Sequence, residues 1–482
     1  MNTPLLTDLY QLTMAAAYWK SGRAEQEAVF HLSFRRAPFG GSYAVAAGLA
    51  EAVDWIRDFQ FRPADLEYLA SLRARNGDPL LPPGFLEYLR DLHLTVDVDA
   101  LPEGTLAFPH EPLVRVRGPQ LQGQLLESAL LCLINFQTLI ATKAARICQA
   151  AQGDPVIEFG LRRAQGPDGA VSASRAAFIG GCSGTSNVRA GQKFGIPLRG
   201  THAHSWVMSF DTEREAFQAY AEALPHNSVF LVDTYDTQQG VEEAIEAGRW
   251  LRAHGHELAG IRLDSGDLAE LSRMARRRLD EAGFPNADIV ASNDLDEHLI
   301  ENLKHQGARI SVWGVGTRLV TGGDQAALGG VYKLGALRRS DGTWDYKLKL
   351  SEQPAKISNP GVLQIRRYRD FRGFIGDLIF DEQTPFPTHA RGVDLHDPTR
   401  LWTAPEGVHE DLLVPVIRAG RPVAASPELT EIQARARNQL NQLPAAMRRF
   451  LNPQPYFVGL VEPLHQTKLQ LLTEARRQGR PA

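Results

Sequence analysis

The stretch from Val156 to Met208 is unusually dense in side chains that can do chemistry. Cations, hydroxyls, amides and imidazoles crowd into about fifty residues that glycines interrupt: Glu158, Arg162, Arg163, Ser183, Thr185, Ser186, Asn187, Arg189, Thr201, His202 and His204. A loop that only joins two elements rarely needs such groups beside a backbone that can approach a ligand closely. The stretch therefore predicts an active site that handles anions.

Two histidines lie in the run from Thr201 to Ser205, at positions 202 and 204. In an extended chain, residues two apart point the same way. A histidine pair first suggests a metal, but no cysteine or third histidine clusters nearby in the sequence, which argues against zinc. We expect an imidazole that acts as a nucleophile or as an acid and base.

Two glycine-containing runs suggest phosphate and ribose binding. Gly314–Gly323 places backbone N–H groups, Thr317 and Thr321 after a predicted strand, as a phosphate cradle requires. Gly260–Asp267 ends a predicted strand with a cation and two carboxylates, which suit ribose hydroxyls or a Mg²⁺ that arrives with a phosphorylated substrate. Helix capping by Ser265 or Asp267 is an alternative explanation for part of the second run.

The run Glu158–Arg163 supplies two arginines directly after a predicted strand. A guanidinium there suits bidentate binding of a carboxylate or a diphosphate. A surface salt bridge to a neighbouring helix explains the same residues equally well. The residues alone leave both interpretations open.

The elements that position these residues follow a βα rhythm from Asp154 onward. Short apolar segments alternate with helical patterns, and seven are predicted strands: 155–159, 198–201, 229–232, 258–263, 288–291, 310–313 and 330–334. So many units imply a parallel sheet with crossover helices, for which a closed or nearly closed barrel is the commonest arrangement. The polar residues fall at the carboxyl ends of six strands, the rim where barrel active sites are built.

The flanking regions read differently. Residues 5–19 predict an amphipathic helix with an apolar stripe, and Asp8, Tyr10 and Gln11 lie off that stripe. Strand patterns at 28–34, 94–99, 105–108 and 113–116 precede a buried helix at 125–140. A hairpin at 412–423 and helices at 427–443 and 465–477 follow the barrel. We predict an α+β domain at 1–120, an α/β barrel at 121–380 and an extension at 381–482 that packs on the first domain.

Composition limits the partners. Lys and Arg number 52 against 56 Asp and Glu, the net charge is −4, and no basic run would follow a nucleic acid backbone. Three dispersed cysteines suit a reducing compartment. The amino-terminal residues lack a signal-peptide pattern, and the most apolar segment is interrupted by polar residues. We expect a cytoplasmic protein that binds neither nucleic acid nor membrane.

The chain resembles bacterial nicotinate phosphoribosyltransferases, of the type II phosphoribosyltransferases. The resemblance spans roughly residues 1 to 380 and rests on several long motifs: Leu5–Met14, Glu158–Gly169, Gly184–Val188, Gly200–Trp206, Gly260–Leu268, Ser292–Asp294 and Gly314–Thr317. It implies a β-rich N-terminal domain, an irregular barrel and a homodimer with shared active sites. The implied reaction joins nicotinate to 5-phosphoribosyl 1-diphosphate, in NAD biosynthesis or salvage, with ATP hydrolysis coupled through a phosphohistidine.

The resemblance also assigns roles to residues. His204 would be phosphorylated, Tyr10 would reach a neighbouring subunit's nicotinate, Thr201 and Arg262 would contact substrate, and Thr317 would bind the 5′-phosphate. The predicted rim adds one catalytic candidate, Asp264, and further substrate contacts: Phe159, Arg162, Asp267, Asn293 and Gly316. We expect Mg²⁺ to arrive with the substrate, with Asp264 as its candidate protein contact, and ATP to be a co-substrate.

Two alternatives remain at this stage. The same scaffold could use nicotinamide or quinolinate, although a site committed to Arg262 or Arg162 should favour an acid, because an unpaired buried cation is costly. The barrel could instead be a sensor that binds a phosphorylated metabolite without turnover, since fold alone does not fix function.

Overall fold

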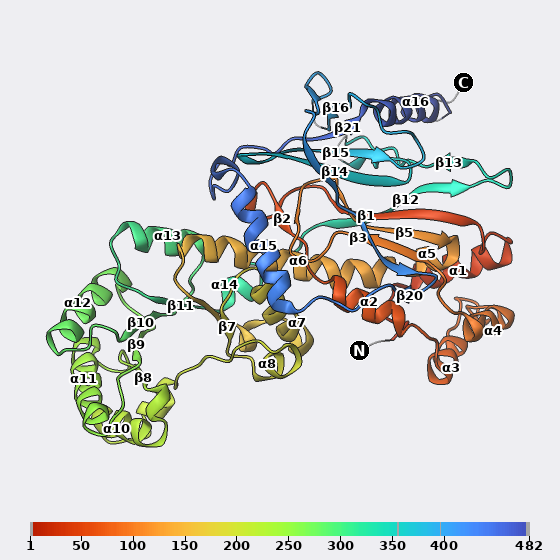
Figure 1. The fold of residues 1–482 in the computed structure, drawn as a ribbon. Coiled ribbons are helices and arrows are strands. Elements are labelled where there is room, and N and C mark those ends of the chain that lie inside the picture. Colours follow the sequence, from red (N-terminus) through yellow and green to blue (C-terminus); the bar gives the residue numbers. More distant parts are fainter. Residues whose placement is uncertain (1–2, 354–355, 396, 479–482) are drawn as a thin grey trace. The chain divides into compact units, whose positions relative to one another are not determined.

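The computed structural model describes residues 3–353, 356–395 and 397–478. The chain forms two compact units, each with its own sheets (Figure 1). Unit 1 contains Met1–Leu139 and Ala327–Ala482, and unit 2 contains Ile140–Ala326. This division differs from the three predicted ranges because the chain returns to the first unit at residue 327, well before residue 380.

A seven-stranded sheet forms the first layer of unit 1, in the order β13-β12-β1-β5-β3-β19-β20. The strands are β1 (Glu27–Phe34), β3 (Asp97–Ala100), β5 (Pro112–Pro119), β12 (Gly330–Arg338), β13 (Trp344–Tyr346), β19 (Val414–Arg418) and β20 (Arg421–Pro422). β12 pairs antiparallel with β1. The prediction of a seventh barrel strand at 330–334 was therefore wrong, since its apolar residues serve an antiparallel sheet equally well.

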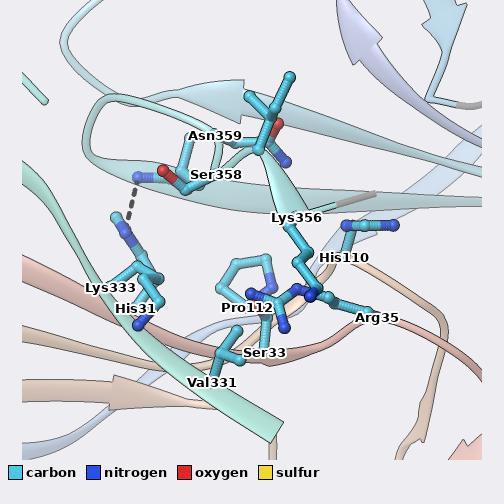
Figure 2. Close-up of a pocket in the computed structure, with 12 residues that line it drawn as sticks. His31, Ser33, Arg35, His110, Pro112, Val331, Lys333, Lys356, Ser358 and Asn359 are labelled. Atoms are coloured by element: carbon cyan, nitrogen blue, oxygen red, sulfur yellow. Dashed lines mark hydrogen bonds between the residues drawn. The ribbon is translucent and has the colours of Figure 1, made fainter. Parts of the chain in front are cut away.

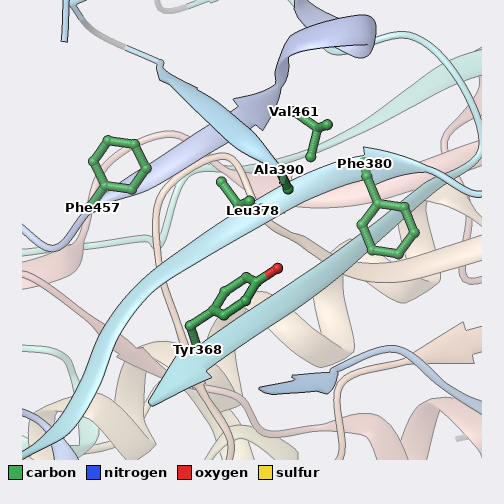
Figure 3. Packing of buried hydrophobic residues seen from close by; sticks show 6 residues of the cluster. All are labelled: Tyr368, Leu378, Phe380, Ala390, Phe457 and Val461. Carbon is green, nitrogen blue, oxygen red and sulfur yellow. The ribbon is translucent and has the colours of Figure 1, made fainter. Parts of the chain in front are cut away.

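The carboxyl-terminal part of the chain builds a six-stranded sheet, in the order β17-β16-β21-β15-β14-β18. Its strands are β14 (Leu363–Asp370), β15 (Gly373–Asp381), β16 (Arg391–Asp394), β17 (Leu401–Thr403), β18 (Val408–Asp411) and β21 (Val458–Val461). One core cluster packs against it: Tyr368, Leu378, Phe380, Ala390, Phe457 and Val461 (Figure 3). The predicted hairpin is β19–β20, and the two predicted helices are α15 (Leu429–Gln442) and α16 (Glu462–Gln478).

Short helices and one small ribbon complete unit 1. They are α1 (Leu9–Lys20), α2 (Leu49–Arg57), α3 (Pro63–Ser71), α4 (Pro83–Asp91), α5 (Gln120–Leu125), and the paired strands β2 (Ala44–Val45) and β4 (Leu106–Ala107). The buried residues of α1 are Gln11, Leu12, Ala15 and Ala16. The expectation that Gln11 lies off the buried face was wrong, because its amide donates to Glu127 Oε2 over 2.9 Å and so can be buried.

Helix α6 (Glu127–Ala150) is the predicted apolar helix, extended by ten residues beyond Ile140. Its 24 residues make it long and apolar enough to cross a bilayer, which the shorter predicted span was not. However, 67% of its most apolar window is buried within the protein, as in the core helix of a folded domain.

Unit 2 is an irregular, barrel-like α/β unit. Its six strands follow the order β7-β6-β11-β10-β9-β8, and every neighbouring pair is parallel: β6 (Val156–Glu158), β7 (Gly184–Thr185), β8 (Val229–Leu231), β9 (Gly260–Leu263), β10 (Asp288–Ala291) and β11 (Val312–Val315). The predicted strand at 198–201 is instead a loop with one isolated bridge, from Leu198 to Thr185. The Thr185 N–H donates to the Pro197 carbonyl and the Arg199 N–H donates to the Thr185 carbonyl, so this segment pairs with β7 at a single residue and forms no strand.

The segments between the strands of unit 2 are helical, and several of the helices begin at a polar side-chain cap. The helices are α7 (Gly166–Ile179), α8 (Val188–Phe194), α9 (His204–Val207), α10 (Glu213–Ala223), α11 (Thr237–Ala253), α12 (Leu268–Glu281), α13 (Glu297–His305) and α14 (Thr317–Val320). Asp236, Asp267 and Asp296 cap α11, α12 and α13 with side-chain oxygens. These caps end three strand-to-helix turns at the same edge of the sheet, so they set where the rim residues lie.

Candidate active site

Arg262 is the centre of the hydrogen-bond network at the carboxyl ends of the strands. It lies on β9 and its guanidinium reaches three different segments: Ser292 Oγ at 2.8 Å, Thr201 Oγ1 at 3.2 Å and Asp264 Oδ1 at 2.9 Å. Its side chain is only 16% exposed. A forked donor held from several sides has a fixed orientation, which is what recognition of a planar carboxylate requires.

Asp264 follows β9, and its two carboxylate oxygens have different neighbours. Oδ1 accepts hydrogen bonds from Arg262 and Ser292, and Oδ2 lies 3.9 Å from His204 Nε2. Partial burial acts to raise the pKa of Asp264, but the hydrogen bonds from Ser292 and Arg262 and the nearby positive charges hold it below its usual value. Asp264 is therefore an anion at neutral pH.

Asp233, at the end of β8, supports the Asp264 turn. Its Oδ2 accepts from the backbone N–H of Asp264 at 2.9 Å and from Ser265 Oγ at 2.6 Å. Its Oδ1 is buried and has no hydrogen-bond partner among the described residues. A buried carboxylate oxygen without a partner is rare, and it marks Asp233 as a further candidate contact for a bound molecule.

The two histidines have different environments. His202 is 8% exposed, its Nε2 accepts from the backbone N–H of Leu231 at 3.2 Å, and burial lowers its pKa to about 4. His204 begins α9 with its side chain 41% exposed, and its Nδ1 lies 3.1 Å from Thr234 Oγ1. His202 is thus a neutral packing residue, whereas the Nε2 of His204 faces the Asp264 carboxylate and is accessible to a ligand.

Phe159 follows β6 and lies beside the Arg262 guanidinium. The guanidinium carbon is 5.6 Å from the centre of the Phe159 ring. A side chain at Gly314 on β11 would meet this ring at 2.7 Å, so the ring packs directly on the glycine. An aromatic face beside a guanidinium suits a flat, anionic ring.

Glu158 has a structural role. It is 1% exposed, its carboxylate accepts from Ser174 Oγ at 2.7 Å and Thr185 Oγ1 at 2.6 Å, and it also accepts the backbone N–H of Gly160. It therefore ties β6, β7 and α7 together and is unavailable to a substrate. Arg162, in contrast, is exposed in the short 3₁₀ turn at Leu161–Arg163.

Helix α14 begins at the predicted phosphate cradle. Gly316 is its N-cap and Thr317 its first residue, both half-buried. A side chain at Gly160 would meet Val320 Cγ1 at 2.2 Å, so the turn after β6 packs tightly on α14. The first N–H groups of a helix lack partners within it and face an incoming anion.

The remaining rim candidates lie at the ends of β9 and β10. Asp267 caps α12 by accepting from the backbone N–H of Glu270 at 3.0 Å, as the capping alternative predicted. Asn293 is exposed and takes the left-handed conformation, with φ of 101°, and Asp294 follows with φ of 32°. The structure thus brings the rim candidates of unit 2 to one edge of the sheet, on different strand ends.

Tyr10 belongs to unit 1, where it lies on α1 and is 48% exposed. Burial of part of the ring and the nearby Glu127 raise its pKa.

A second feature of unit 1 is a pocket lined by several basic side chains, among them Arg35, His110, Lys333 and Lys356 (Figure 2). Arg35, Lys333 and Lys356 make this pocket electropositive. Burial lowers the pKa of Lys333, and the charges of Lys349 and Arg35 add to this effect while Glu127 opposes it. The sequence reading did not single out any of these residues.

The donor groups of the rim fit Mg²⁺ bound through a substrate better than a resident metal. Within the described ranges, no group of three or more histidine, cysteine or acidic residues is placed to hold a metal ion. Among the residues that the structure describes, Asp264 Oδ2 and Asp233 Oδ1 have no cation partner within salt-bridge distance other than His204. Two such oxygens suit an ion that receives its other ligands from phosphates and water.

Sequence reasoning missed two members of this site. One is Thr234, which contacts His204. The other is Ser292, which bonds Arg262 and Asp264 and which the sequence places only within the Ser292–Asp294 motif. Both directly follow residues at strand ends, so their position in the βα rhythm was the available signal.

Family models match three segments that together cover most of the chain. Residues 5–135 match the nicotinate phosphoribosyltransferase N-terminal domain, residues 155–342 the nicotinate phosphoribosyltransferase family, and residues 364–468 its C-terminal domain. The nicotinate phosphoribosyltransferase of Bacillus subtilis is 43% identical, with 98% of this chain and 96% of that protein covered. The chain belongs to the nicotinate phosphoribosyltransferase family.

Other relatives agree with this membership. The human family member is 38% identical over 96% of this chain and 95% of its own length. The crystal structure of human nicotinic acid phosphoribosyltransferase superposes with a TM-score of 0.84 at 34% identity, covering 96% of this chain and 99% of that chain. A nicotinate-nucleotide pyrophosphorylase structure from Pyrococcus furiosus, at 22% identity and a TM-score of 0.68, shares the fold.

Proposed function

We propose that this protein joins nicotinate to 5-phosphoribosyl 1-diphosphate, forming nicotinate mononucleotide and diphosphate. The observation that carries the proposal is the pairing of Arg262 with the Phe159 ring, 5.6 Å apart at the strand ends. The ring would stack on the pyridine, and the guanidinium would attract its carboxylate. Family membership supports the same substrates.

The reaction needs few covalent steps from the protein. The pyridine nitrogen of nicotinate attacks C1′ of the ribose as the bond from C1′ to the diphosphate breaks, and the diphosphate leaves with that electron pair. The ribose gains positive charge in the transition state, so a nearby carboxylate stabilises it. Asp264 is anionic at neutral pH and is assigned this role, with Arg162 exposed to bind the departing anion.

The rest of the rim would hold the donor. The N–H groups at Gly316 and the hydroxyl of Thr317 would bind the 5′-phosphate, while Asp267 and Asn293 would contact the ribose. Thr201 would contact substrate beside Arg262. Mg²⁺ would shield the diphosphate charge, with Asp264 and Asp233 as its protein contacts.

ATP would be coupled through phosphorylation of His204. Its Nδ1 is held by Thr234, which leaves the exposed Nε2 to attack the γ-phosphorus of ATP, with ADP leaving. Water later attacks the phosphorus of the phosphohistidine, the P–N bond breaks, and inorganic phosphate leaves as the imidazole is restored. A phosphoryl group beside the rim would change the affinity for the donor, so that ATP acts on binding rather than on the bond-breaking step.

A homodimer with shared sites is part of the same proposal. Tyr10 and the electropositive pocket of Figure 2 belong to unit 1, whereas the rim belongs to unit 2. A partner's exposed tyrosine would cover the bound pyridine. Sedimentation of the active enzyme tests this, and a fully active monomer would contradict it.

The direct test is synthesis. Purified protein incubated with nicotinate, the phosphoribosyl donor, Mg²⁺ and ATP should form the mononucleotide, and omission of ATP should slow it. Nicotinamide should be a poor substrate, because it lacks the carboxylate that the Arg262 guanidinium would attract in nicotinate. Equal efficiency with both bases would contradict the substrate assignment, and binding of the donor without any turnover would favour a sensor.

A further inference from the structure

A buried ion triad lies behind the rim in unit 2. Glu297, the first residue of α13, accepts from Lys143 Nζ at 2.5 Å and from Arg146 Nε at 2.7 Å. Both cations come from α6. The side chains are almost sealed from water, with exposures of 1% for Glu297, 6% for Lys143 and 3% for Arg146.

Stability alone is a poor explanation for this triad. Removing three charges from water costs several kcal/mol per ion, and well-packed apolar residues often stabilise such a position as well or better. Although burial acts to raise the pKa of Glu297, the two cations hold it below its usual value, so the triad stays charged. A buried, charged and hydrogen-bonded group does, however, fix the geometry of the segments that it joins.

One of those segments is the strained turn after β10. Asn293 and Asp294 both have positive φ, a conformation that is costly for a non-glycine residue and persists only when its surroundings enforce it. On its amino side the turn is held by the pairing of β10. On its carboxyl side it is held by Asp296, which accepts the N–H groups of His298 and Leu299, and then by Glu297.

The second segment is the glycine loop that follows α14. A side chain at Gly323 would approach Lys143 Nζ to 3.7 Å, so the ammonium that bonds Glu297 also lies against this loop. Gly323 itself has φ of 58°. Lys143 therefore bonds Glu297, which holds the turn at Asn293, and also lies against the loop that follows α14.

We infer that Glu297, Lys143 and Arg146 are positioning residues that set the spacing between the Asn293 turn and the loop after α14, and thereby the fit of the phosphoribosyl donor. This inference rests on the proposed function. The three residues touch no substrate and act through the two rim segments. A shift of about 1 Å in such groups is enough to cost up to about 100-fold in rate, so the triad should affect the donor rather than nicotinate.

The same helix offers a matched control. At the other end of α13, Lys304 Nζ lies 2.5 Å from Asp154 Oδ2, and Asp154 also accepts from Trp313 Nε1 at 3.0 Å. Asp154 precedes β6, so this pair lies at the amino ends of the strands, away from the rim. Glu297→Gln and Asp154→Asn each remove a carboxylate that anchors α13, but only the first should disturb the rim.

The experiment compares steady-state kinetics of wild type, Glu297→Gln and Asp154→Asn with each substrate varied in turn. Glu297→Gln should raise KM for the phosphoribosyl donor about 10-fold or more and change KM for nicotinate less than about twofold. Asp154→Asn should leave both within about twofold. Similar donor effects in both variants, or an equal rise for both substrates in Glu297→Gln, would overturn the inference.

Hydrogen exchange provides a readout that does not depend on activity. Amides in 293–299 and 317–323 should exchange faster in Glu297→Gln than in wild type, and those segments should be unchanged in Asp154→Asn. If wild type makes no nucleotide, the proposed function fails while this comparison still decides the positioning role. If Glu297→Gln does not fold, Lys143→Met replaces it, because this variant keeps the ion pair between Arg146 and Glu297. The same changes in donor KM and in hydrogen exchange are then expected. Unchanged exchange in 317–323 would overturn the inference.

Discussion

The Arg262 guanidinium donates to Thr201 Oγ1 over 3.2 Å, and this bond joins β9 to the loop that carries His202 and leads into α9, where His204 is the first residue. Thr201→Val keeps the shape of the side chain but removes the acceptor, so the guanidinium loses one of its three constraints. We expect kcat/KM for nicotinate to fall about 10-fold, which corresponds to about 1.4 kcal/mol of transition-state stabilisation. Steady-state kinetics with nicotinate varied measures this.

Thr201→Ser is the control for that variant. It retains the hydroxyl and should keep nicotinate kinetics within about threefold of wild type. A loss in Thr201→Ser as large as that in Thr201→Val would show that the methyl packing matters and the hydrogen bond does not.

Substitution of His204 and substitution of His202 should have different effects on phosphorylation. His204→Ala should abolish labelling of the protein by γ-labelled ATP and the stimulation by ATP, yet leave slow synthesis, because Gly316, Thr317 and Asp264 are unchanged. Labelling at the level of background in His204→Ala, with synthesis that no longer responds to ATP, is the expected result. Labelling that survives in this variant would contradict the assignment.

His202→Ala tests the expectation that His202 is a packing residue and is not phosphorylated. His202 Nε2 accepts the backbone N–H of Leu231 inside the protein, and the ring packs on Phe217, Tyr220 and Phe230. Removing it leaves a buried N–H without its partner and a cavity, which together cost about 2 to 4 kcal/mol. A lower thermal midpoint with labelling retained is expected; loss of labelling in a folded His202→Ala protein would move the phosphorylation site.

Many of the rim residues could be predicted because they directly follow the strands in the sequence. Parallel strands put their carboxyl ends at one edge, so Asp264, Asn293 and Thr317 could be placed together from the βα rhythm alone. The strand at 330–338 was misplaced because alternation gives the local conformation and not the pairing partner, which here is β1. The burial of Gln11 depended on its contact with Glu127, more than a hundred residues away, and local pattern cannot show such a partner.

The distinction between the two histidines also required the structure. Residues two apart in an extended strand would face the same way, but the chain at 198–203 is a loop and His204 begins a helix. His202 turns towards β8, whereas His204 turns towards Thr234. The ion triad at Glu297 was equally inaccessible, because Lys143 and Arg146 lie about 150 residues earlier in the chain and beyond the predicted end of the buried helix at residue 140.

Gly314 should control the position of the Phe159 ring. An added methyl at Gly314 would meet two ring carbons at 2.7 Å, which is closer than carbon atoms approach, so the ring must move. Gly314→Ala should therefore raise KM for nicotinate about 10-fold and change KM for the phosphoribosyl donor by less than about threefold. Fluorescence or calorimetric binding of nicotinate offers a second measurement.

Gly169→Ala is the matched control for that glycine. It lies on α7, and an added methyl there would meet nothing within 4 Å. In a helix, alanine is favoured over glycine by about 0.5 to 1 kcal/mol, so this variant should be slightly more stable than wild type with unaltered kinetics. Equal nicotinate KM in Gly314→Ala and Gly169→Ala would disprove the ring contact as a determinant of base binding.

The last prediction concerns Glu213, the first residue of α10. Its side chain is buried, and Oε1 has no hydrogen-bond partner among the described residues. Burial, followed by the negative charges of Glu243, Asp236 and Asp233, raises its pKa to about 7. The unfolded chain binds this proton less tightly, so the contribution of Glu213 to stability is fully present below its ordinary pKa and is lost as pH rises towards and through 7.

Glu213→Gln should remove this pH dependence, because the amide resembles the protonated acid at every pH. The variant should be more stable than wild type at pH 8, by about 1 to 3 kcal/mol, and the difference should shrink at pH 5. Thermal unfolding at both pH values measures it, with Glu222→Gln, an exposed position on the same helix, as the control. A larger gain at pH 5 than at pH 8 would have the wrong sign and would show that Glu213 is stabilised as an anion, by a group that its carboxylate does not meet in this structure.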